Sequence, residues 1–568
     1  MKPTPTQSNI NSSARKLRIG LIVDSENSTK YVYELCEWGH SQTNLSITHL
    51  IIQKPPAAQK STLARLVHSA LQHGIQNLTR QVSFALLTKL EALSLSFTRQ
   101  HGDHLKKFNL SNFIERTVQI TPIVSKSGFV YRYSDEDVTR IQDLELDVLI
   151  GCGSGILRGS ILSSTRLGII SFHHADNRVN RGGPPGFWEV YSKQESTGFV
   201  IQQLSEELDG GAVLFRGCFR TRRSYLLNQA CLYRKSNVYL RKILSDIAEH
   251  DSLPSPLDPF PYFNRLFKRP GVLQQCRYLG YLISASAKKA IMKSLFRRDY
   301  RWGVAFSKTD WQSLVMWRSE RIRNPANHFL ADPFVISTED GAYCFVEDYD
   351  YAIAKACIAV YRLDGKTPER LGVAIAEPFH LSFPYLFQFE SKLYMCPETS
   401  ENRDIRIYEC VKFPLEWRLK KVLMSDLSAV DTMIFEREGL WWLFTNIDLA
   451  NSGDATAELF IYYADSPLAD VWRPHPKNPI FVDSTRARNG GLLHANGAIY
   501  RVSQAQGFDL YGKRSTINKI IILNESEYLE NAMISIEANF FPKLNGTHHL
   551  HSNGVYSAFD YVSWTRIG

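Results

Sequence analysis

The sequence predicts two domains of different class, an α/β domain up to about residue 250 and an all-β domain from residue 302 to residue 568. Two observations support this division. In the first part, short apolar segments alternate with helical ones, which is typical of βαβ units and a largely parallel, Rossmann-like sheet. Beyond residue 302 the chain changes to short aromatic and β-branched segments separated by turns, which is typical of antiparallel β structure.

Residues 1–16 are polar and predict a disordered tail. The first domain, residues 17–250, begins with a buried strand over 16–24, a helix over 29–38 and a second strand over 46–52. The turn after the first strand lacks the Gly-x-Gly-x-x-Gly pattern. The sequence therefore disfavours dinucleotide binding.

An inserted helical hairpin is predicted over residues 61–110, where leucines recur at helical spacing. A strand over 116–124 and a helix over 135–144 follow, and Ser134 is the expected N-cap of that helix. A long helix over 228–249 should close the domain.

The stretch from residue 147 to residue 211 carries the candidate chemistry of this domain. His173 ends one short apolar strand, and Asp209 follows the next strand along the chain. Strand ends of an open α/β sheet point into the crevice where ligands bind, so the two side chains form a candidate catalytic pair. The turn after the preceding strand is rich in glycine and contains Gly151, Gly153 and Gly155.

Three motifs in this stretch resemble those of the formyltransferase family, which uses 10-formyltetrahydrofolate and includes sugar N-formyltransferases. They are Ser171-Phe-His173, Arg181-Gly182 and Leu208-Asp209-Gly210-Gly211. The spacing of His173 and Asp209 agrees with that of the family. The resemblance implies that His173 lies beside the formyl carbon, and that Asp209 orients His173 and assists removal of the amine proton. It further implies contacts to the folate from Gly151, Gly153, Gly155 and Leu208, and contacts to the acceptor from Arg181, Gly182, His174 and Asn177.

The chain departs from the family at Ser171, where the family has asparagine. The asparagine contributes an amide N–H to the oxyanion, whereas the serine hydroxyl is shorter and rotates freely. Loss of such a donor is worth about 3 kcal/mol in other oxyanion holes. A slower enzyme, a compensating donor from His174 or Asn177, and a lost activity all remain open.

Residues 251–301 are predicted to be a linker. Four prolines between 254 and 261 break the chain, and residues 278–298 form a basic amphipathic helix. Peripheral membrane contact is one interpretation of this helix. A bridging helix that packs on its own two domains is the other.

A loose repeat organises residues 302–568. An apolar strand, an acidic or glycine turn and an aromatic strand recur roughly every fifty residues, as at propeller blades. The aromatic positions of four copies are Tyr343, Tyr394, Trp441 and Tyr500, and a weaker fifth copy covers residues 548–564. Five copies predict a five-bladed β-propeller; a two-sheet sandwich is the alternative.

Several phrases of this domain resemble the propeller domain of plant glucosamine inositolphosphorylceramide transferases and, more distantly, five-bladed glycoside hydrolases. They include His380-Leu-Ser-Phe-Pro, Cys396-Pro-Glu398-Thr and His494-Ala-Asn-Gly. Asp332, Glu398 and Asp431 come from three successive units and could converge at one end of a central channel. Their order differs from the Asp-Asp-Glu order of the hydrolases. Blade-capping carboxylates, sugar binding together with His380, His494 and His551, and catalysis stay open as alternatives.

Composition limits the classes of partner. The nine cysteines are scattered and none forms a Cys-x-x-Cys pair, so neither a zinc ribbon nor a disulfide framework is predicted, and no metal site is expected. A net charge of +9 is mild for 568 residues; it suits nucleotide-sugars, folate glutamates or a membrane surface and does not indicate nucleic acid. The start is not a secretory signal, and no window is apolar enough to span a bilayer, which together favour a cytoplasmic location.

These observations predict an N-formyltransferase that moves a formyl group from 10-formyltetrahydrofolate to an amino sugar, either nucleotide- or lipid-linked. The propeller would bind the glycan in polysaccharide or glycolipid biosynthesis. One alternative is a glycosyltransferase or glycan-processing protein with a degenerate formyltransferase-like domain. Another is a glycan-binding scaffold without catalytic activity. The sequence does not determine the oligomeric state.

Overall fold

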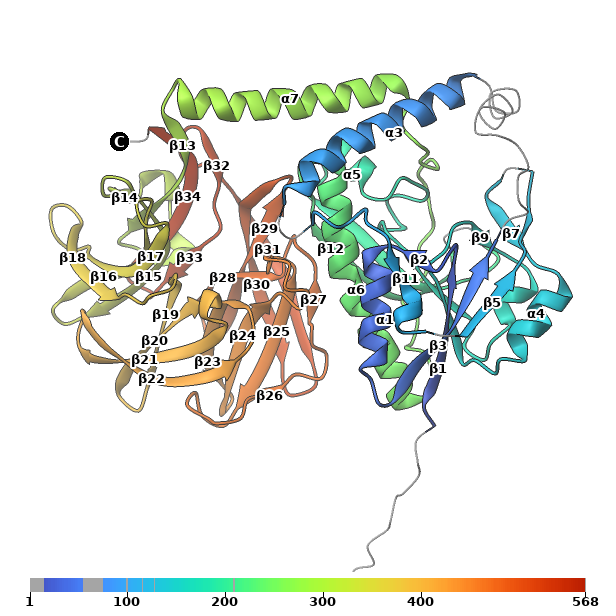
Figure 1. Ribbon diagram of the computed structural model, residues 1–568. Coiled ribbons are helices and arrows are strands. Elements are labelled where there is room, and N and C mark those ends of the chain that lie inside the picture. Colours follow the sequence, from blue (N-terminus) through green and yellow to red (C-terminus); the bar gives the residue numbers. More distant parts are fainter. Residues whose placement is uncertain are drawn as a thin grey trace, which may run out of the picture. The chain divides into compact units, whose positions relative to one another are not determined.

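The computed structural model of the chain forms two compact units (Figure 1). The first unit comprises the chain up to Pro185 together with Phe199–Arg216 and Ala230–Arg269; the second comprises Gly186–Gly198, Gly217–Gln229 and Pro270–Gly568. The structure describes residues 15–54, 75–98, 101–114, 116–126, 128–207 and 210–566.

The first unit is built on a seven-stranded mixed sheet in the order β12-β11-β10-β8-β1-β3-β5. β1 runs parallel to β3 and β8, β8 runs parallel to β10, and β11 runs antiparallel to β10. The strands are β1 Leu17–Val23, β3 Leu45–Gln53, β5 Arg116–Ile120, β8 Val148–Gly151, β10 Ile169–His173, β11 Ser196–Gln203 and β12 Ala212–Arg220. The α/β class predicted for this part of the chain is confirmed.

Helices cover the sheet because their apolar residues recur at helical spacing. Val138 and Ile141 of α4 pack on Ile22 and Leu149, which lie on β1 and β8. Ser134 caps α4 as predicted, because its side chain accepts a hydrogen bond from the Asp137 N–H. The first unit holds α1 Lys30–His40, α3 Ile75–Ser96, α4 Asp135–Gln142 and most of α6 Tyr225–His250. The second unit holds α5 Phe187–Tyr191 and α7 Val272–Ser294. The first part of the predicted hairpin over 61–110 lies outside the described residues.

From β13 onward the chain forms five antiparallel sheets. The first joins β13 Arg298–Ser307 and β14 Glu320–Ile322 to the last strands, β32 Leu544–Gly546, β33 Leu550–Ser552 and β34 Ser557–Arg566. The second holds β15 His328–Thr338, β16 Gly341–Asp350, β17 Lys355–Arg362 and β18 Glu369–Ile375. The third holds β19 Ser382–Phe389, β20 Lys392–Thr399, β21 Asp404–Lys412 and β22 Glu416–Ser425.

The two remaining sheets complete this region. One holds β23 Ala429–Arg437, β24 Leu440–Ile447, β25 Glu458–Ala464, β26 Arg473–Pro474 and β27 Phe481–Val482. The other holds β28 Arg488–Ala495, β29 Ala498–Gly507, β30 Leu510–Leu523 and β31 Tyr528–Glu537. One strand of each sheet contacts the next in a closed order, β15 to β19 to β23 to β28 to β33 and back to β15. The predicted β character of residues 302–568 is confirmed.

A buried ion pair lies within the last of these sheets. Arg501 on β29 is fully buried, and its Nε lies 2.7 Å from Oε2 of Glu530 on β31, while Nη2 lies 2.5 Å from Oε1. Nη1 and Nη2 of Arg501 also donate to the carbonyl oxygens of Ala487 and Arg486. The guanidinium thus replaces its lost hydration with charge-assisted hydrogen bonds, as a buried charge requires.

Candidate functional site

Interruptions of the strand register bring polar groups together in the second unit. The first strands of four sheets each contain a β-bulge where the register with the neighbouring strand shifts. Each bulge holds a residue with positive φ: Asp332 at 49°, Phe383 at 45°, Asp431 at 49° and Gly491 at 126°. A bulge bends the strand and re-aims its side chains, and aspartate tolerates the left-handed region better than most residues. Two of the three carboxylates predicted for this domain therefore occupy equivalent bulges.

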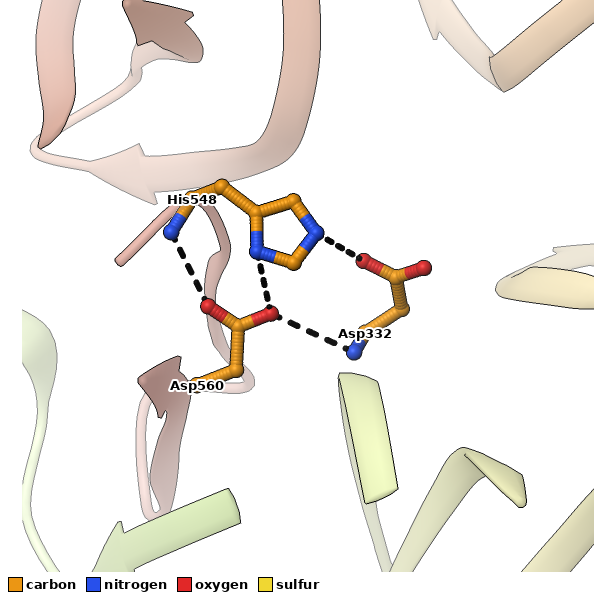
Figure 2. Close-up of side chains that lie close together, drawn as sticks. All are labelled: Asp332, His548 and Asp560. Atoms are coloured by element: carbon orange, nitrogen blue, oxygen red, sulfur yellow. Dashed lines mark hydrogen bonds and ion pairs between the residues drawn. The ribbon is translucent and has the colours of Figure 1, made fainter. Parts of the chain in front are cut away.

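Asp332 faces a histidine from the end of the chain (Figure 2). Nε2 of His548 lies 3.3 Å from Oδ1 of Asp332, and Nδ1 lies 2.7 Å from Oδ2 of Asp560. All three residues are buried. Burial alone would lower the pKa of His548, but the carboxylates of Asp560 and Asp332 raise it to about 10. His548 is therefore an imidazolium that has a carboxylate at each ring nitrogen.

The three groups lie close enough together to share a metal ion. An imidazolium has no free lone pair for a metal, because both of its nitrogens carry protons. In its protonated form His548 therefore pairs with the two carboxylates and is not a metal ligand.

A second carboxyl group, that of Glu347, has a pKa shifted in the direction opposite to that of Asp332. Glu347 on β16 is buried, and its Oε1 lies 3.5 Å from Nε2 of His380. Burial raises the pKa of Glu347 well above its ordinary value, and the negative charges of Asp332 and Glu398 raise it further. For Asp332, burial acts in the same direction, but the hydrogen bond from His548 and the neighbouring charges lower its pKa below the ordinary value. Burial and the neighbouring charges therefore shift the pKa values of these two carboxyl groups in opposite directions.

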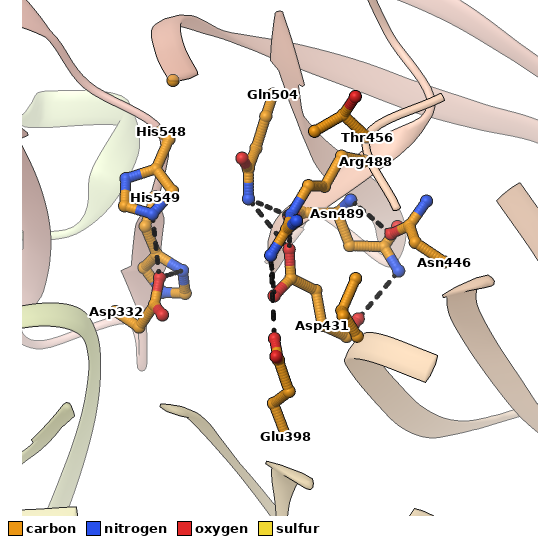
Figure 3. Close-up of polar contacts among 12 residues, drawn as sticks. Asp332, Glu398, Asp431, Asn446, Thr456, Arg488, Asn489, Gln504, His548 and His549 are labelled. Atoms are coloured by element: carbon orange, nitrogen blue, oxygen red, sulfur yellow. Dashed lines mark hydrogen bonds and ion pairs between the residues drawn. The ribbon is translucent and has the colours of Figure 1, made fainter. Parts of the chain in front are cut away.

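Asp431 and Glu398 share one guanidinium (Figure 3). Nε of Arg488 lies 2.6 Å from Oδ2 of Asp431, and its Nη2 lies 3.6 Å from Oε2 of Glu398. Gln504 Nε2 also donates to Asp431 Oδ2 at 3.0 Å. Burial would lower the pKa of Arg488, but Asp431 and Glu398 raise it well above the ordinary value. Figure 3 shows this group beside Asp332 and His548.

The structure brings the predicted carboxylates Asp332, Glu398 and Asp431 into one polar cluster, and His380 reaches it through Glu347. The other two predicted histidines, His551 and His494, contact different groups. Nδ1 of His551 accepts the Val335 N–H at 3.1 Å, and burial lowers the pKa of His551 to about 3. His494 lies near the turn end of β28, where its carbonyl oxygen accepts the Trp311 indole N–H.

Sequence reasoning missed four members of the cluster: Glu347, Arg488, His548 and Asp560. No local motif marks them. Glu347 lies within an ordinary aromatic strand, β16, and Asp560 lies in the final strand, β34, without a neighbouring turn signal. Only the His548-His549 pair was conspicuous as adjacent ionisable residues.

The raised pKa of His548 predicts a pH-dependent stability. The folded pKa of about 10 exceeds the unfolded value of about 6.5. The charged triad therefore contributes its full stability below about pH 6.5, and this contribution is lost as pH rises toward 10. We expect the stability difference between the wild type and His548→Gln to shrink from pH 6 to pH 10, measured by urea unfolding. A difference that stays constant over this range would contradict the imidazolium assignment.

In the first unit, the predicted formyltransferase-type residues have partners within the protein. The hydroxyl of Ser171 donates to the Gly151 carbonyl oxygen at 2.9 Å. His173 is buried, and its Nε2 lies 2.8 Å from the carbonyl oxygen of Asn180. Leu208 and Asp209 lie outside the described residues, so the predicted pairing of His173 with Asp209 stays a prediction.

His174 lies in an aromatic cluster. Its ring stacks on Tyr233 with centroids 3.9 Å apart and on Phe172 at 4.7 Å. Burial lowers the pKa of His174 to about 3. The ring is therefore neutral and enclosed by apolar surfaces, which is a poor position for the compensating oxyanion donor proposed from the sequence.

The loop with Asn177, Arg181 and Gly182 packs against a later segment of the same unit. The Arg181 guanidinium lies over the Tyr262 ring at 4.7 Å, and the Arg181 N–H donates to the Tyr262 hydroxyl. Asn177 Oδ1 accepts from Arg216. Gly182 has φ of 104°, and an added Cβ would lie 2.2 Å from the Phe267 carbonyl oxygen. Glycine is thus required here by the close approach of residue 267.

A cavity of about 170 Å³ adjoins the glycine-rich turn. The residues that line it include Gly151, Gly153, Gly155, Ser171 and Glu207. Gly153 leaves room for Gln53, because a Cβ there would lie 2.5 Å from the Gln53 Nε2. The predicted cofactor glycines therefore border a cavity, and His173 is not among its lining residues.

Comparison with known proteins finds two kinds of relative. The family model described as the N-terminal part of glucosamine inositolphosphorylceramide transferase 1 matches residues 314–552. That segment holds the whole polar cluster except Asp560. Glucosamine inositolphosphorylceramide transferase 1 from Arabidopsis thaliana is 39% identical over 221 residues, which are 38% of this chain and 28% of the relative. The chain thus spans little more than a quarter of the length of that relative.

The first unit has a weaker relative. Methionyl-tRNA formyltransferase from Bacillus subtilis (strain 168) is 22% identical over 191 residues, which are 34% of this chain and 58% of the relative. Among solved structures, Zg3597, a family 117 glycoside hydrolase from Zobellia galactanivorans, is 12% identical with a TM-score of 0.32. The match covers 46% of this chain and 91% of the Zg3597 chain. The similar sequences are transferases by name, which agrees with the predicted enzyme class at that level.

Proposed function

We propose that residues 302–568 form a five-bladed β-propeller that acts on a sugar linkage of a glycolipid, as a glycosyltransferase or glycan-processing enzyme. This corresponds to the alternative weighed from the sequence, and it is better supported than formyl transfer. The closed order of strand contacts from β15 to β33 supports the propeller. The family match supports the substrate class, since the name of the relatives contains an amino sugar and a phosphoinositol lipid.

One observation carries the catalytic part of the proposal: two carboxyl groups of the same cluster have pKa values shifted in opposite directions. Asp332 is kept ionised by His548, whereas Glu347 is kept protonated by burial and by its acidic neighbours. Opposite shifts of this kind are how acid and base roles are divided within an active site.

The division of roles follows from the protonation states. Glu347 donates its proton to the oxygen that leaves the sugar, and Asp332 accepts the proton of the attacking hydroxyl or water. Arg488 fixes Asp431 and Glu398, which then offer oxygen atoms to sugar hydroxyls. His548 and Asp560 hold Asp332 in position and in its charged form.

The test is an assay of the full chain with two kinds of substrate. Inositolphosphorylceramide is supplied with a nucleotide-activated amino sugar, and separately a glycosylated inositolphosphorylceramide is supplied with water. Products are identified by mass spectrometry. A new or a shortened glycan supports the proposal that the chain is an enzyme. The substrate combination that gives the product shows whether the reaction is transfer or hydrolysis. Tight glycolipid binding without product would reject catalysis and favour the scaffold alternative.

The cavity in the first unit supports a second candidate, formyl transfer from 10-formyltetrahydrofolate to an amino sugar. The cavity borders Gly151, Gly153 and Gly155, the residues that the formyltransferase resemblance assigns to the folate. Against it, the hydroxyl of Ser171 and Nε2 of His173 are both engaged with backbone carbonyl groups. For this candidate, binding of the folate is therefore tested before transfer of the formyl group.

For this candidate we expect 10-formyltetrahydrofolate to bind the wild type, as measured by calorimetry. Ser205→Trp should abolish binding, because Ser205 is exposed and lines the cavity, so that an indole there fills it. Ser163→Trp, an exposed position of the same unit that does not line the cavity, is the control. Equal binding of 10-formyltetrahydrofolate by both variants would show that it does not bind in this cavity. Absence of binding to the wild type would reject this candidate.

A further inference from the structure

Helix α7 exposes a continuous apolar face in the second unit. Its buried side chains are those of Gln275 and Tyr278 near the N-terminal end. On the opposite face, exposed residues with apolar or small side chains recur at intervals of three or four positions, which places them in one row along the helix. These residues are Leu273, Cys276, Gly280, Ile283, Ala287 and Ile291. Leu273 is 72% exposed and Ile283 is 68% exposed, so no described part of the chain covers this face.

The charges of α7 are all of one sign. Between Val272 and Arg298 the sequence contains six basic residues and no aspartate or glutamate. They are Arg277, Lys288, Lys289, Lys293, Arg297 and Arg298. Leu295 and Phe296, both exposed, lie among the last four of them. An apolar face flanked only by basic residues is the pattern of helices that lie in the interface of anionic membranes.

The same charges disfavour a second copy of α7 as the partner that covers this face. Two copies of α7 paired in parallel would bring their basic C-terminal ends together, and in an antiparallel pair no acidic residue of α7 would face those ends. Among the described residues, no helix is long and apolar enough to span a membrane. We therefore propose that the chain binds the surface of a membrane rich in anionic lipid, with α7 lying in the headgroup region.

A second helix, α3 in the first unit, has a face of the same chemistry. Phe84, Leu87 and Leu95 are buried on one side. On the other side five large apolar residues form an exposed row: Val82, Leu86, Leu90, Leu93 and Phe97. The basic residues of α3, Arg80 and Lys89, are exposed, and its one acidic residue, Glu91, is buried. The geometry of α3 assigns it as a second membrane contact.

The experiment is co-flotation of the full chain with phosphatidylcholine vesicles that contain or lack phosphatidylserine. We expect binding only with phosphatidylserine, and weaker binding at high salt. Lys288→Glu/Lys289→Glu/Lys293→Glu should weaken binding by at least about 100-fold, since each basic residue near an anionic surface contributes about fivefold. Ile283→Ser/Ile291→Ser should weaken it without changing the net charge. Lys308→Glu/Lys366→Glu/Lys412→Glu, exposed lysines of the β sheets, make the same charge change and should bind as the wild type does.

Three results would overturn the proposal. The first is no binding to either kind of vesicle. The second is binding that the α7 variants leave unchanged. The third is self-association of the wild type, seen by light scattering, that Ile283→Ser/Ile291→Ser removes, because the apolar face would then belong to a dimer. Leu86→Ser/Leu90→Ser tests α3 separately, and unchanged binding by it would remove α3 as a contact. All of these readouts are independent of catalytic activity.

Discussion

Replacing Asp332 with asparagine is expected to lower the rate of turnover of the sugar substrate by about 10²–10⁴-fold, the usual effect of removing a general base. Asparagine retains the size of the side chain and also tolerates the positive φ of this bulge, so the backbone should persist. It loses the charge that accepts the substrate proton and faces His548. Binding of the glycolipid should change far less than turnover, since the amide still offers an oxygen to a hydroxyl.

The pH dependence of the rate separates the two roles. Because burial and acidic neighbours raise the pKa of Glu347, the wild type should lose activity as pH rises and this acid deprotonates. Glu347→Gln should be slow at every pH and lack this alkaline decline, whereas Asp332→Asn should be slow but retain it. Asp340→Asn, an exposed carboxylate in the turn after β15, should match the wild type. Full activity in Asp332→Asn would reject Asp332 as the base.

Replacing Arg501 with methionine is expected to destabilise the sheet formed by β28–β31 by about 3–5 kcal/mol, because it leaves the buried carboxylate of Glu530 without its partner. The Glu530 side chain is only 3% exposed. The double variant Arg501→Met/Glu530→Met should recover much of the loss, since it buries two apolar groups in place of an ion pair. Urea unfolding, followed by circular dichroism, gives the comparison.

An exposed pair provides the control for Arg501. Lys412 and Glu416 lie 3.8 Å apart and are both largely exposed. Lys412→Met should therefore change the free energy of unfolding by less than about 1 kcal/mol. If Arg501→Met were no more destabilising than Lys412→Met, the Arg501–Glu530 pair would not be an important source of stability. If the double variant were as unstable as the single one, the packing of Arg501 rather than its charge would be responsible.

Much of the fold could be predicted locally. The period of two in the strands and the helical spacing of apolar residues predicted β1, α1, β3 and α4 to within a few residues. The recurring aromatic strands predicted the β class after residue 302. Asp332, Glu398 and Asp431 could be identified because they come from three successive units of the repeat, in a part of the chain that resembles known propeller domains. Ser171 was identified as a departure from the formyltransferase pattern, but its hydrogen bond to Gly151 could not be foreseen from that pattern.

The sequence by itself determined the elements of this protein, their class and three of the carboxylates of the polar cluster, because these depend on side chains a few residues apart. Only the tertiary structure brought His548 to Asp332 and Arg488 to Asp431. The first contact joins β15 to the segment between β32 and β33, and the second joins β23 to β28. In both cases the partners are separated by stretches of chain that carry no periodic signal for the pairing. Opposite shifts of the pKa values of Asp332 and Glu347 arise in the same way, since burial and the charges of distant strands set them.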